Sequence, residues 1–342
     1  MRILLIMDPG IPVPPPLYGG HERLVYLFAE EYSKLGHQVT LLAGPDSQFN
    51  GKVITFGVNN LKRSKQQRLK ELFFTWRWLI NHRHDFDLIH NFGRLAYLLP
   101  LLNKPVKKIM TYGRPVARHG IKLVNMLANR NLVFTACSNY CVSTGNVAGS
   151  WKTVYNAIRF ADYQLREQVE NLAPLMFLGR LDRIKGAHVA IEVAKATGRR
   201  LLLAGNISGE DDGKDYYESV LAPQIDQETI IYLGPLNDEQ KNKYLGQAAA
   251  LLFPISWNEP FGLVMIEANA CGTPVIAFNG GSVPEVIEPG INGLIVDSVD
   301  QMIATVGVAE KIDRRRCRSW AEERFDVKKI ALDYLALASS WE

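Results

Sequence analysis

Residues 257–274 read WNEPFGLVMIEANACGTP and lie between two apolar runs. The run before them, AALLFPIS at 249–256, has the length and apolar content of a buried strand, and so has VIAF at 275–278. LVMIEANACG at 263–272 is typical of a buried helix that ends at Gly and Pro. A strand, a loop, a helix and a second strand are the repeating unit of a parallel α/β sheet.

The same alternation runs outward along the whole chain. Ile3–Met7 is the first predicted strand, a helix is expected from about residue 20 or 21 to residue 34, and Val39–Ala43 is the second strand. A second series of strands and helices starts at Pro174. Two such series in tandem predict two doubly wound, Rossmann-like domains with parallel sheets. Further strands are expected at Asp87–His90, Lys108–Met110, Val133–Ala136, 175–179, 200–205 and 230–234.

A polar stretch, ADYQLREQVENLAP at 161–174, separates the two series. A chain of 342 residues, 47% of them hydrophobic, suits two cores of ordinary size. We therefore place an N-terminal domain at 1–158 and a C-terminal domain at 159–326, with the last helix, about 327–342, packing back on the first domain. Ligands bind beyond the carboxyl ends of parallel strands, so we expect the chemistry in a cleft where the two domains face each other.

Composition argues against several classes of protein. No uninterrupted apolar run reaches 18 residues, and MRILLIMDPG at the start is expected to be a buried strand rather than an export signal. The four cysteines form no CxxC pair and have no histidine at metal-ligand spacing, which argues against a disulfide framework and a zinc site. A cytoplasmic protein is the simplest interpretation.

Charge is divided unevenly along the chain. Residues 1–160 contain 21 Lys and Arg against 8 Asp and Glu, whereas the remainder contains 18 against 27. The first half is therefore expected to meet an anionic partner or surface, with no nucleic acid among its partners, although related domains also drift in charge.

A predicted helix from 64 to 82 carries apolar residues at helical spacing among several Lys and Arg. Two interpretations stay open. The helix packs on its own sheet, or it lies peripherally on an anionic membrane, at the inner face. The apolar positions are Leu69, Leu72, Phe73, Trp76, Leu79 and Ile80.

Tyr18, Gly19 and Gly20 follow the first strand and open the first helix. Backbone N–H groups at such a helix start receive phosphates, although paired glycines there also form ordinary tight turns. The segment is not GxGxxG, and no acidic residue stands at the end of the second strand, about twenty positions on. A nicotinamide dinucleotide is therefore disfavoured.

Basic and acidic residues follow two strands of the second series. Gly179-Arg180 ends one strand and Lys185 precedes the next helix, so both cations can converge on one anion and stabilise a leaving diphosphate. Outside such a context they would be solvated surface residues.

Glu259 lies in the loop before a helix and Glu267 one turn inside it. Sugar hydroxyls are suitable donors to a buried carboxylate, and the plainer alternative is a capping Glu with a satisfied core Glu.

These segments resemble the glycosyltransferases of family 4, and the resemblance covers nearly the whole chain. YGGHERLVYLFAEEYSKLGHQVTLLAG at 18–44 resembles the family's opening, FLGRLDRIKGAHVAIEVAK at 177–195 its phosphate-binding segment, and NEPFGLVMIEANACGTPVIAFNGGSVPEVI at 258–287 its E-x7-E region. The resemblance implies a GT-B fold and a nucleoside-diphosphate sugar donor, in the first place a UDP-hexose. It also implies retention of anomeric configuration, with no cofactor and no essential metal.

By position in these motifs, the resemblance implies roles for single residues. Arg180 and Lys185 would hold the donor diphosphate, Glu259 the hydroxyls of the donor sugar, and Glu267 the ribose. Arg180, Lys185 and Glu259 would act in catalysis. The remaining donor-binding residues that the motifs imply are Gly19, Gly20, Gly179, Leu236, Pro260, Phe261, Gly262 and Leu263.

One segment departs from the family's pattern. Many members carry a His after the strand that corresponds to KKIMT, in a T-x-H-G-like setting, where it approaches the reacting sugar. Here the chain reads MTYGRP, so Thr111, Tyr112 or Gly113 takes that place. Either the reaction does not need that His, or the activity or the acceptor has changed.

Candidates for the acceptor side are His90 and Tyr112. His90, like His84 and His119, is not an obvious substitute for the family's His, because a lone His is more often a surface or a satisfied residue.

The leading hypothesis is an enzyme that moves a hexose from UDP, or from another nucleoside diphosphate, to an acceptor held by the basic first domain. One alternative is an epimerase-like or phosphorylase-like GT-B enzyme, although a phosphorylase would need a pyridoxal-phosphate lysine and a far longer chain. The other is a sugar-nucleotide-binding protein without catalysis. Turnover of a nucleotide sugar separates the enzyme from the binding protein.

Overall fold

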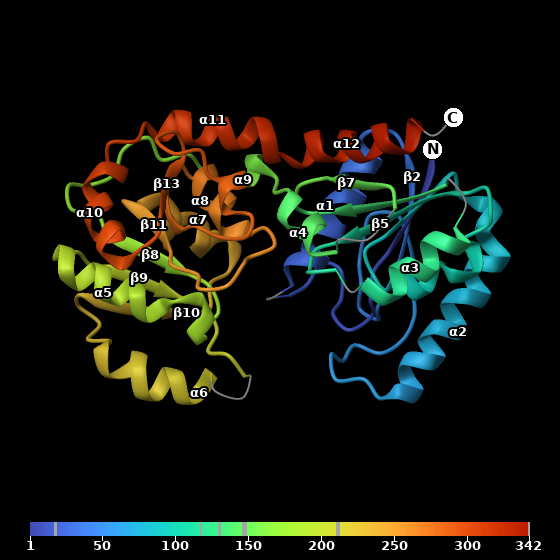
Figure 1. Cartoon of the computed structure of the whole chain (residues 1–342), viewed down its shortest axis with the longest axis horizontal. Helices are drawn as coiled ribbons and strands as arrows, with labels where there is room; N and C mark the ends of the chain where they lie inside the picture. Colours follow the sequence, from blue (N-terminus) through green and yellow to red (C-terminus); the bar gives the residue numbers. More distant parts are fainter. Residues whose placement is uncertain (17–18, 117, 129–130, 146–148, 210–212, 341–342) are drawn as a thin grey trace. The chain divides into compact units, whose positions relative to one another are not determined.

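The computed structural model describes residues 1–16, 19–116, 118–128, 131–145, 149–209 and 213–340. The chain forms two compact units (Figure 1): unit 1 consists of 1–157 with 327–342, and unit 2 of 158–326. The domain limits expected from the sequence, 158 and 159, differ from these by one residue.

Unit 1 is built on a seven-stranded sheet with the order β3-β2-β1-β4-β5-β6-β7, in which all neighbours are parallel. β1 pairs with β2 on one side and β4 on the other, so the winding direction reverses between β1 and β4. This is the topological switch point of unit 1. The strands are β1 (Arg2–Ile6), β2 (Gln38–Ala43), β3 (Lys52–Thr55), β4 (Leu88–Asn91), β5 (Lys107–Tyr112), β6 (Leu132–Ala136) and β7 (Trp151–Thr153).

Helices cover both faces of this sheet, which explains the uninterrupted apolar run of β1. Ile3 and Leu5 face a core shared with α1 and α12, in which Phe28 and Tyr334 are buried. Leu4, on the opposite face, packs in a second core with α2, α3 and η2. The helices of unit 1 are α1 (Gly20–Lys34), α2 (Lys65–His82), α3 (Arg118–Leu127), α4 (Asn139–Gly145) and α12 (Val327–Ser339), with the 3-10 turns η1 (Arg83–Asp85) and η2 (Leu95–Leu101).

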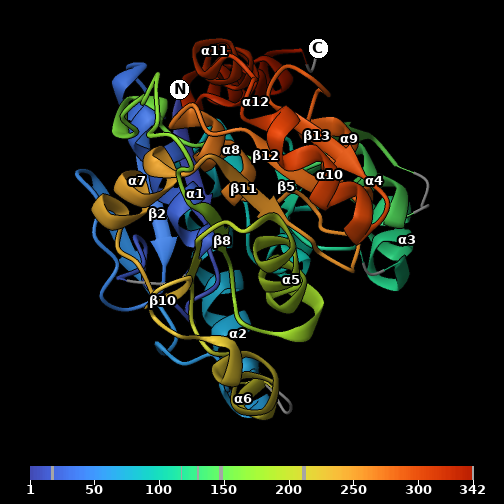
Figure 2. The same ribbon diagram turned by 90° about the vertical axis from the view of Figure 1, so that its left-hand side faces the viewer.

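Unit 2 repeats the plan with a six-stranded parallel sheet, in the order β10-β9-β8-β11-β12-β13. Its switch point lies between β8 and β11. Figure 2 looks onto this unit, with α5 and α10 in front of the sheet. The strands are β8 (Leu175–Leu178), β9 (Leu201–Ala204), β10 (Ile230–Gly234), β11 (Ala250–Phe253), β12 (Val275–Phe278) and β13 (Gly293–Val296).

Seven α-helices and four shorter turns are described in unit 2. The helices are α5 (Ala187–Thr197), α6 (Gly213–Tyr216), α7 (Asp238–Gln247), α8 (Leu263–Ala270), α9 (Val283–Val286), α10 (Val299–Ala309) and α11 (Arg314–Phe325). The turns are η3 (Phe160–Asp162), η4 (Arg183–Lys185), η5 (Tyr217–Leu221) and η6 (Ala222–Gln224). None of the described helices in either unit is long and apolar enough to cross a bilayer.

α2 buries a different face from the one that its apolar spacing predicts. Its buried residues are Glu71, Thr75 and Leu79, whereas Leu69 and Phe73 are 54% and 63% exposed. The idea that the whole apolar stripe packs on the sheet is therefore wrong. Polar contacts explain which face of α2 points inward. The Glu71 carboxylate pairs with arginines on the buried side of the helix and so fixes the rotation of the helix. The outward face carries Leu69, Phe73 and Ile80 beside the exposed Lys65, Lys70 and Arg77.

Several strands and helices are not predicted from the sequence, among them β3, β7, β13, α3 and α4. β3 is short and only partly buried, because it forms the edge of its sheet. β13 begins at Gly293, which lies so close to the β12 backbone that a Cβ there would be 2.3 Å from the carbonyl oxygen of Val275. α3 is amphipathic and buries Ile121 and Val124.

Candidate functional site

The predicted donor-binding residues gather at the switch point of unit 2. Gly179 and Arg180 follow β8, the loop with Trp257 and Glu259 follows β11, and both strands end at the same edge because they are neighbours in a parallel sheet. At Gly186, a Cβ would lie 2.2 Å from the carbonyl oxygen of Pro254. The loops after β8 and β11 are therefore in direct backbone contact, which requires glycine at this position.

Lys185 and Glu259 form an ion pair at this edge. The Lys185 Nζ lies 2.5 Å from the Glu259 Oε2, and the Trp257 indole Nε1 donates to the same oxygen at 2.9 Å. Lys185 Nζ also lies 5.3 Å from the centroid of the Trp257 ring. The Glu259 Oε1 has no hydrogen-bond partner within the part of the chain that the structure describes. One carboxylate oxygen thus orients Lys185, and the other can accept a hydroxyl.

Arg180 and Asp182 form the second pair after β8. Their side chains are 2.9 Å apart, and the Asp182 carboxylate also accepts from the backbone N–H of Lys185 at 3.1 Å, where it caps η4. Arg180 and Lys185 are thereby fixed on the same loop by acidic partners. Two oriented cations at the end of a strand can bind a diphosphate.

The loop before α8 is rigid and tightly packed. Gly262 is the N-cap with φ 77°, and a Cβ there would lie 2.8 Å from Met265 and 2.9 Å from Phe253. Ser282 donates its backbone N–H to the carbonyl of Glu259 at 3.0 Å and its hydroxyl to the carbonyl of Phe261 at 3.0 Å. Pro260 is buried in this loop and Leu263 is partly exposed at the first position of α8.

The side chain of Phe261, a predicted donor-binding residue, is buried away from solvent. Its ring is 2% exposed and packs edge-on against Phe325, with centroids 5.6 Å apart. Only its backbone is therefore available to a ligand, as the resemblance implies. The first N–H groups of α8 have no carbonyl within the helix to bond, which suits an anion or a hydroxyl oxygen at this end.

Glu267 lies in α8 and is 8% exposed. Its Oε1 accepts from the Tyr163 hydroxyl at 3.0 Å and from Lys241 Nζ at 2.5 Å, so protein groups supply the donors that a buried carboxylate requires. Its Oε2 has no hydrogen bond to any described residue and can accept from a ligand. Leu236 lies just after β10, partly exposed, on the same edge of the sheet.

Unit 1 has a pocket of about 420 Å³ at its own switch point. It is lined by residues that follow β1, β4 and β5 and by the starts of α1 and α2. A cavity of this size suits a small molecule. The polar and charged lining residues are Asp8, His21, Glu22, Arg63, Arg68, Arg94, Thr111, Tyr112 and Arg114.

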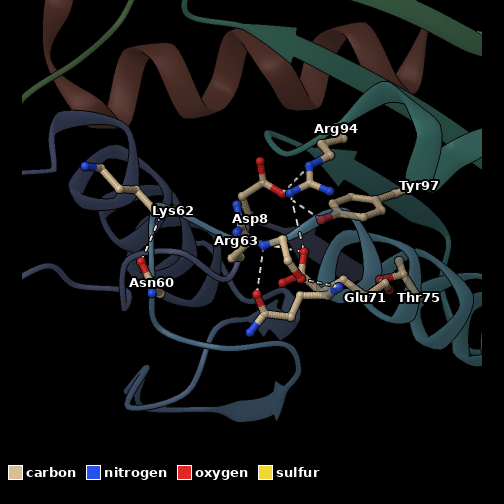
Figure 3. Close-up of polar contacts among 10 residues, drawn as sticks. Asp8, Asn60, Lys62, Arg63, Glu71, Thr75, Arg94 and Tyr97 are labelled. Carbon is tan, nitrogen blue, oxygen red and sulfur yellow. Dashed lines mark hydrogen bonds and ion pairs between the residues drawn. The ribbon is translucent and has the colours of Figure 1, made fainter.

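A buried ion network forms one side of this pocket (Figure 3). The Glu71 carboxylate lies 3.3 Å from Arg63 Nη1 and 3.4 Å from Arg94 Nη2, and its side chain is 2% exposed. The Asp8 carboxylate lies 3.3 Å from Arg94 Nε and accepts from the Tyr97 hydroxyl at 2.6 Å. Burial and the nearby Asp8 raise the pKa of Tyr97, which keeps its hydroxyl protonated. Two carboxylates therefore hold two guanidinium groups in fixed positions.

His21 lies against Gly113, on the segment that departs from the family's pattern. A Cβ at Gly113 would be 2.5 Å from the His21 Nε2, so the absence of a side chain at Gly113 makes room for the ring. Nε2 is buried without a hydrogen-bond partner among the described residues. Burial, and then the positive charge of Arg114, lower the pKa of His21 from 6.5 to about 4. The imidazole is neutral at pH 7.

Gly19 and Gly20 are placed as the sequence predicts, at the start of α1. Gly19 is the N-cap with φ 152°, and a Cβ there would lie 2.7 Å from Pro15 and 2.9 Å from the Glu22 carboxylate. Only glycine fits this turn. Tyr18 falls outside the described residues.

The His90 side chain faces the core of unit 1, which contradicts the expectation that it lies on the acceptor side. Its side chain is fully buried in the α1 side of unit 1, where the imidazole lies 4.4 Å from the Tyr334 ring and 4.1 Å from the Phe92 ring. Nε2 is 2.8 Å from the Thr111 hydroxyl. Alternation along β4 directs this side chain into the core. Tyr112, in contrast, lines the pocket, and burial raises its pKa.

Sequence reasoning missed the arginines of the pocket and His21. Arg63 lies in a loop without recognisable pattern, and Arg68 lies in the helix that follows this loop. Arg94 follows β4, and Arg114 follows β5. In the sequence, His21 belongs only to the segment that resembles the family's opening. The one available signal was the charge excess of residues 1–160. In the described ranges, no three His, Cys, Asp or Glu side chains are arranged to hold a metal ion.

Family models match each unit of the chain separately. The model described as "Glycosyl transferases group 1" matches residues 166–322, within unit 2. The model described as "Glycosyltransferase Family 4" matches residues 18–142, within unit 1. Together the two matches cover most of the chain and occur in the order of its two sheets.

Several known proteins are similar to this chain. A protein in the cps region of Klebsiella pneumoniae, itself uncharacterized, is 28% identical over 75% of this chain and 80% of its own length. A D-inositol 3-phosphate glycosyltransferase of Mycolicibacterium smegmatis is 35% identical over 40% of this chain, and that match spans 32% of the relative's length. The solved structure of Anabaena HepE in complex with UDP-glucose superposes with a TM-score of 0.76 at 20% identity, covering 99% of this chain and all of HepE. That likeness shows the GT-B fold.

Lowering the pH is expected to destabilise the protein through His21. The unfolded chain takes up a proton at His21 below pH 6.5, whereas the folded protein does so only near pH 4. The contribution to the free energy of unfolding is therefore complete above pH 6.5 and is lost as the pH falls towards 4, by roughly 2.5 kcal/mol at pH 4.5. Urea unfolding at pH 7 and 4.5 measures it, with His21→Gln for comparison. An equal loss in both proteins would contradict the lowered pKa, since all other groups are shared.

Proposed function

Because the chain belongs to the family-4 glycosyltransferases, we propose that it transfers a hexose from a UDP-hexose, with retention of anomeric configuration, to an acceptor bound by unit 1. The arrangement of Arg180, Lys185 and Glu259 at the switch point of unit 2 supports this proposal most. It combines cations suited to a diphosphate with a carboxylate oxygen suited to a sugar hydroxyl. HepE, which shares the fold, has been crystallised with UDP-glucose, and this supports the choice of donor.

In the proposed reaction, unit 2 holds the donor. Arg180 and Lys185 bind the diphosphate and neutralise the charge that it gains as the bond to the sugar breaks. The free Oε1 of Glu259 accepts from a sugar hydroxyl, and the free Oε2 of Glu267 accepts from the ribose. Leu236 lies beside the base, and the backbone of Phe261 to Leu263 contacts the sugar and phosphates.

The acceptor step follows from retention. The acceptor hydroxyl approaches the anomeric carbon on the face from which the diphosphate leaves, so that the new bond has the configuration of the old one. As the bond from the anomeric carbon to the diphosphate oxygen breaks, that oxygen takes the proton of the hydroxyl. Arg180 and Lys185 assist the departure. Gly19 and Gly20 present backbone N–H groups at the start of α1, where a phosphate oxygen is a suitable acceptor.

Removing single donor-site groups is expected to abolish most of the activity. Lys185→Ala, Arg180→Ala and Glu259→Ala should each lower kcat/KM at least about 100-fold, as for loss of one stabilising group in a transition state. Turnover of UDP-glucose, as transfer or as donor hydrolysis, is the measurement. Lys195→Ala is the matched control, because Lys195 is exposed in the last turn of α5. Wild-type rates in the three variants, or UDP-sugar binding without any turnover, would contradict the proposal.

We propose that the reaction needs no bound metal, since two cationic side chains already occupy the place where a metal would neutralise the diphosphate. Activity after dialysis against EDTA is expected to remain within about two-fold of the untreated enzyme. Adding back Mg²⁺ or Mn²⁺ should change the rate no further. A loss of ten-fold or more that either ion restores would show that a metal takes part.

We propose a cytoplasmic protein that touches an anionic membrane through the outward face of α2. The exposed Leu69, Phe73 and Ile80 form an apolar ridge flanked by Lys70 and Arg77, which is the pattern of an interfacial helix. The four cysteines are buried, and none of them forms a disulfide in the described ranges, which fits a reducing compartment.

Vesicle sedimentation tests this contact. Binding to vesicles with about 30% phosphatidylglycerol is expected to fall at least five-fold in a Leu69→Ser and Phe73→Ser double variant, because these side chains insert between headgroups. Leu332→Ser on α12, where the leucine is 46% exposed, is the control. Equal binding to neutral and anionic vesicles would rule out the contact.

A further inference from the structure

The pocket of unit 1 contains more guanidinium groups than carboxylates. Arg63, Arg68, Arg94 and Arg114 line it, against Asp8 and Glu22. A third carboxylate, Glu71, lies beneath the lining. The excess is concentrated in a cavity at a switch point, where the ends of parallel strands leave room for a ligand.

Arg63 and Arg94 form the fixed part of this cluster. Arg63 is 7% exposed at its side chain, and its Nη1 is bound to Glu71, but its buried Nε has no hydrogen-bond partner among the described residues. Glu71 also binds Arg94, which in turn contacts Asp8. Glu71 and Asp8 together balance the charges of Arg63 and Arg94 and hold both guanidinium groups in place. The excess positive charge of the pocket therefore comes from Arg68 and Arg114.

Arg68 and Arg114 form the open part of the cluster. Both are exposed, and neither forms an ion pair with a carboxylate within the described ranges. They come from different elements, since Arg68 lies in the first turns of α2 and Arg114 follows β5. Two unpaired guanidinium groups beside two fixed ones can grip a planar or tetrahedral anion through several N–H donors.

We propose that this pocket is the acceptor site and that it selects an acceptor by a negatively charged group, a phosphate or a carboxylate carried on a sugar. The inference rests on the proposed glycosyl transfer and adds the chemical class of the acceptor. Arg68 and Arg114 bind the charged group, with Arg63 and Arg94 behind them. The volume of about 420 Å³ admits a monosaccharide with one such substituent.

The rest of the lining suits the sugar part of the acceptor. Asp8 and Tyr97 are already joined by a hydrogen bond, and the Asp8 carboxylate retains lone pairs for a hydroxyl. His21 lines the pocket, and its neutral imidazole adds no positive charge. Phe92 lines the pocket and offers an apolar surface to a sugar ring. The anion site and the hydroxyl-binding groups therefore belong to one cavity.

Isothermal titration without donor tests the proposal, with glucose, glucose 6-phosphate, glucuronate and inorganic phosphate as probes. Glucose 6-phosphate or glucuronate is expected to bind at least ten-fold more tightly than glucose, and the better of the two identifies the charged group. Inorganic phosphate alone should bind more weakly than the charged sugar. Equal affinity for charged and neutral sugars, or for phosphate and the charged sugars, overturns the proposal.

Variants of the pocket arginines test whether these residues cause the preference for a charged sugar. In Arg68→Gln with Arg114→Gln, both exposed residues whose loss leaves the core intact, the preference for the charged sugar should fall about ten-fold. The double variant Lys70→Gln with Arg77→Gln removes an equal charge from the outward face of α2 and should leave the preference unchanged. A similar loss in this control would mean that overall charge, and not the pocket, attracts the anion.

Lys185→Ala separates this inference from the proposed function. That variant lacks a donor-site cation of unit 2, so it should bind the charged sugar as the wild type does while losing turnover. If wild-type protein binds the charged sugar but transfers no hexose to it, the acceptor assignment fails even though donor hydrolysis persists. If donor hydrolysis is absent as well, the proposed function itself fails.

Discussion

Parallel strands that wind in opposite directions from the middle of a sheet leave an open space at their carboxyl ends. The helices that follow the two central strands depart to opposite faces, so no connection fills the gap between them. Both units of this chain obey that constraint, at β1 and β4 in unit 1 and at β8 and β11 in unit 2. The charged groups of the donor site and of the unit 1 pocket lie on loops or helices that border one of these two places. The chemistry thus depends first on topology and only then on residue type.

Within that space, acidic residues orient basic ones. Glu259 holds Lys185 and Asp182 holds Arg180 in unit 2, and Glu71 holds Arg63 and Arg94 in unit 1. An isolated cation on a loop would move among many rotamers and lose entropy on binding a ligand. A carboxylate that pairs with the cation already restricts its rotamers in the free protein, so less side-chain entropy is lost when the ligand binds. The ion pairs in both units therefore prepare binding sites as well as contribute to folding.

Glycine allows close approach where two backbones, or a backbone and a ring, come into contact. Gly186 lets the loop after β8 touch the backbone beyond β11, and Gly113 leaves the volume that the His21 ring occupies. In each case a methyl group would displace either a backbone carbonyl or an imidazole. The MTYGRP segment, in which the family's His is missing, thus still has a histidine at its side, brought there from α1.

The alternation of apolar runs and helical patterns in the sequence predicts the two parallel sheets, and it places Arg180, Lys185 and Glu259 after neighbouring strands. These follow from local periodicity and from the rule that parallel strands end together. Three features depend on tertiary contacts and could not be predicted from the sequence. They are the rotation of α2, the burial of His90, and the meeting of four arginines in one pocket, Arg63, Arg68, Arg94 and Arg114. Helical spacing records which residues share a face but not which face is buried, and a carboxylate such as Glu71 can turn a helix inward against its apolar stripe. The lining of that pocket joins residues up to 107 positions apart in the chain, from Met7 to Arg114. Long-range proximity of this kind leaves no local pattern in the sequence.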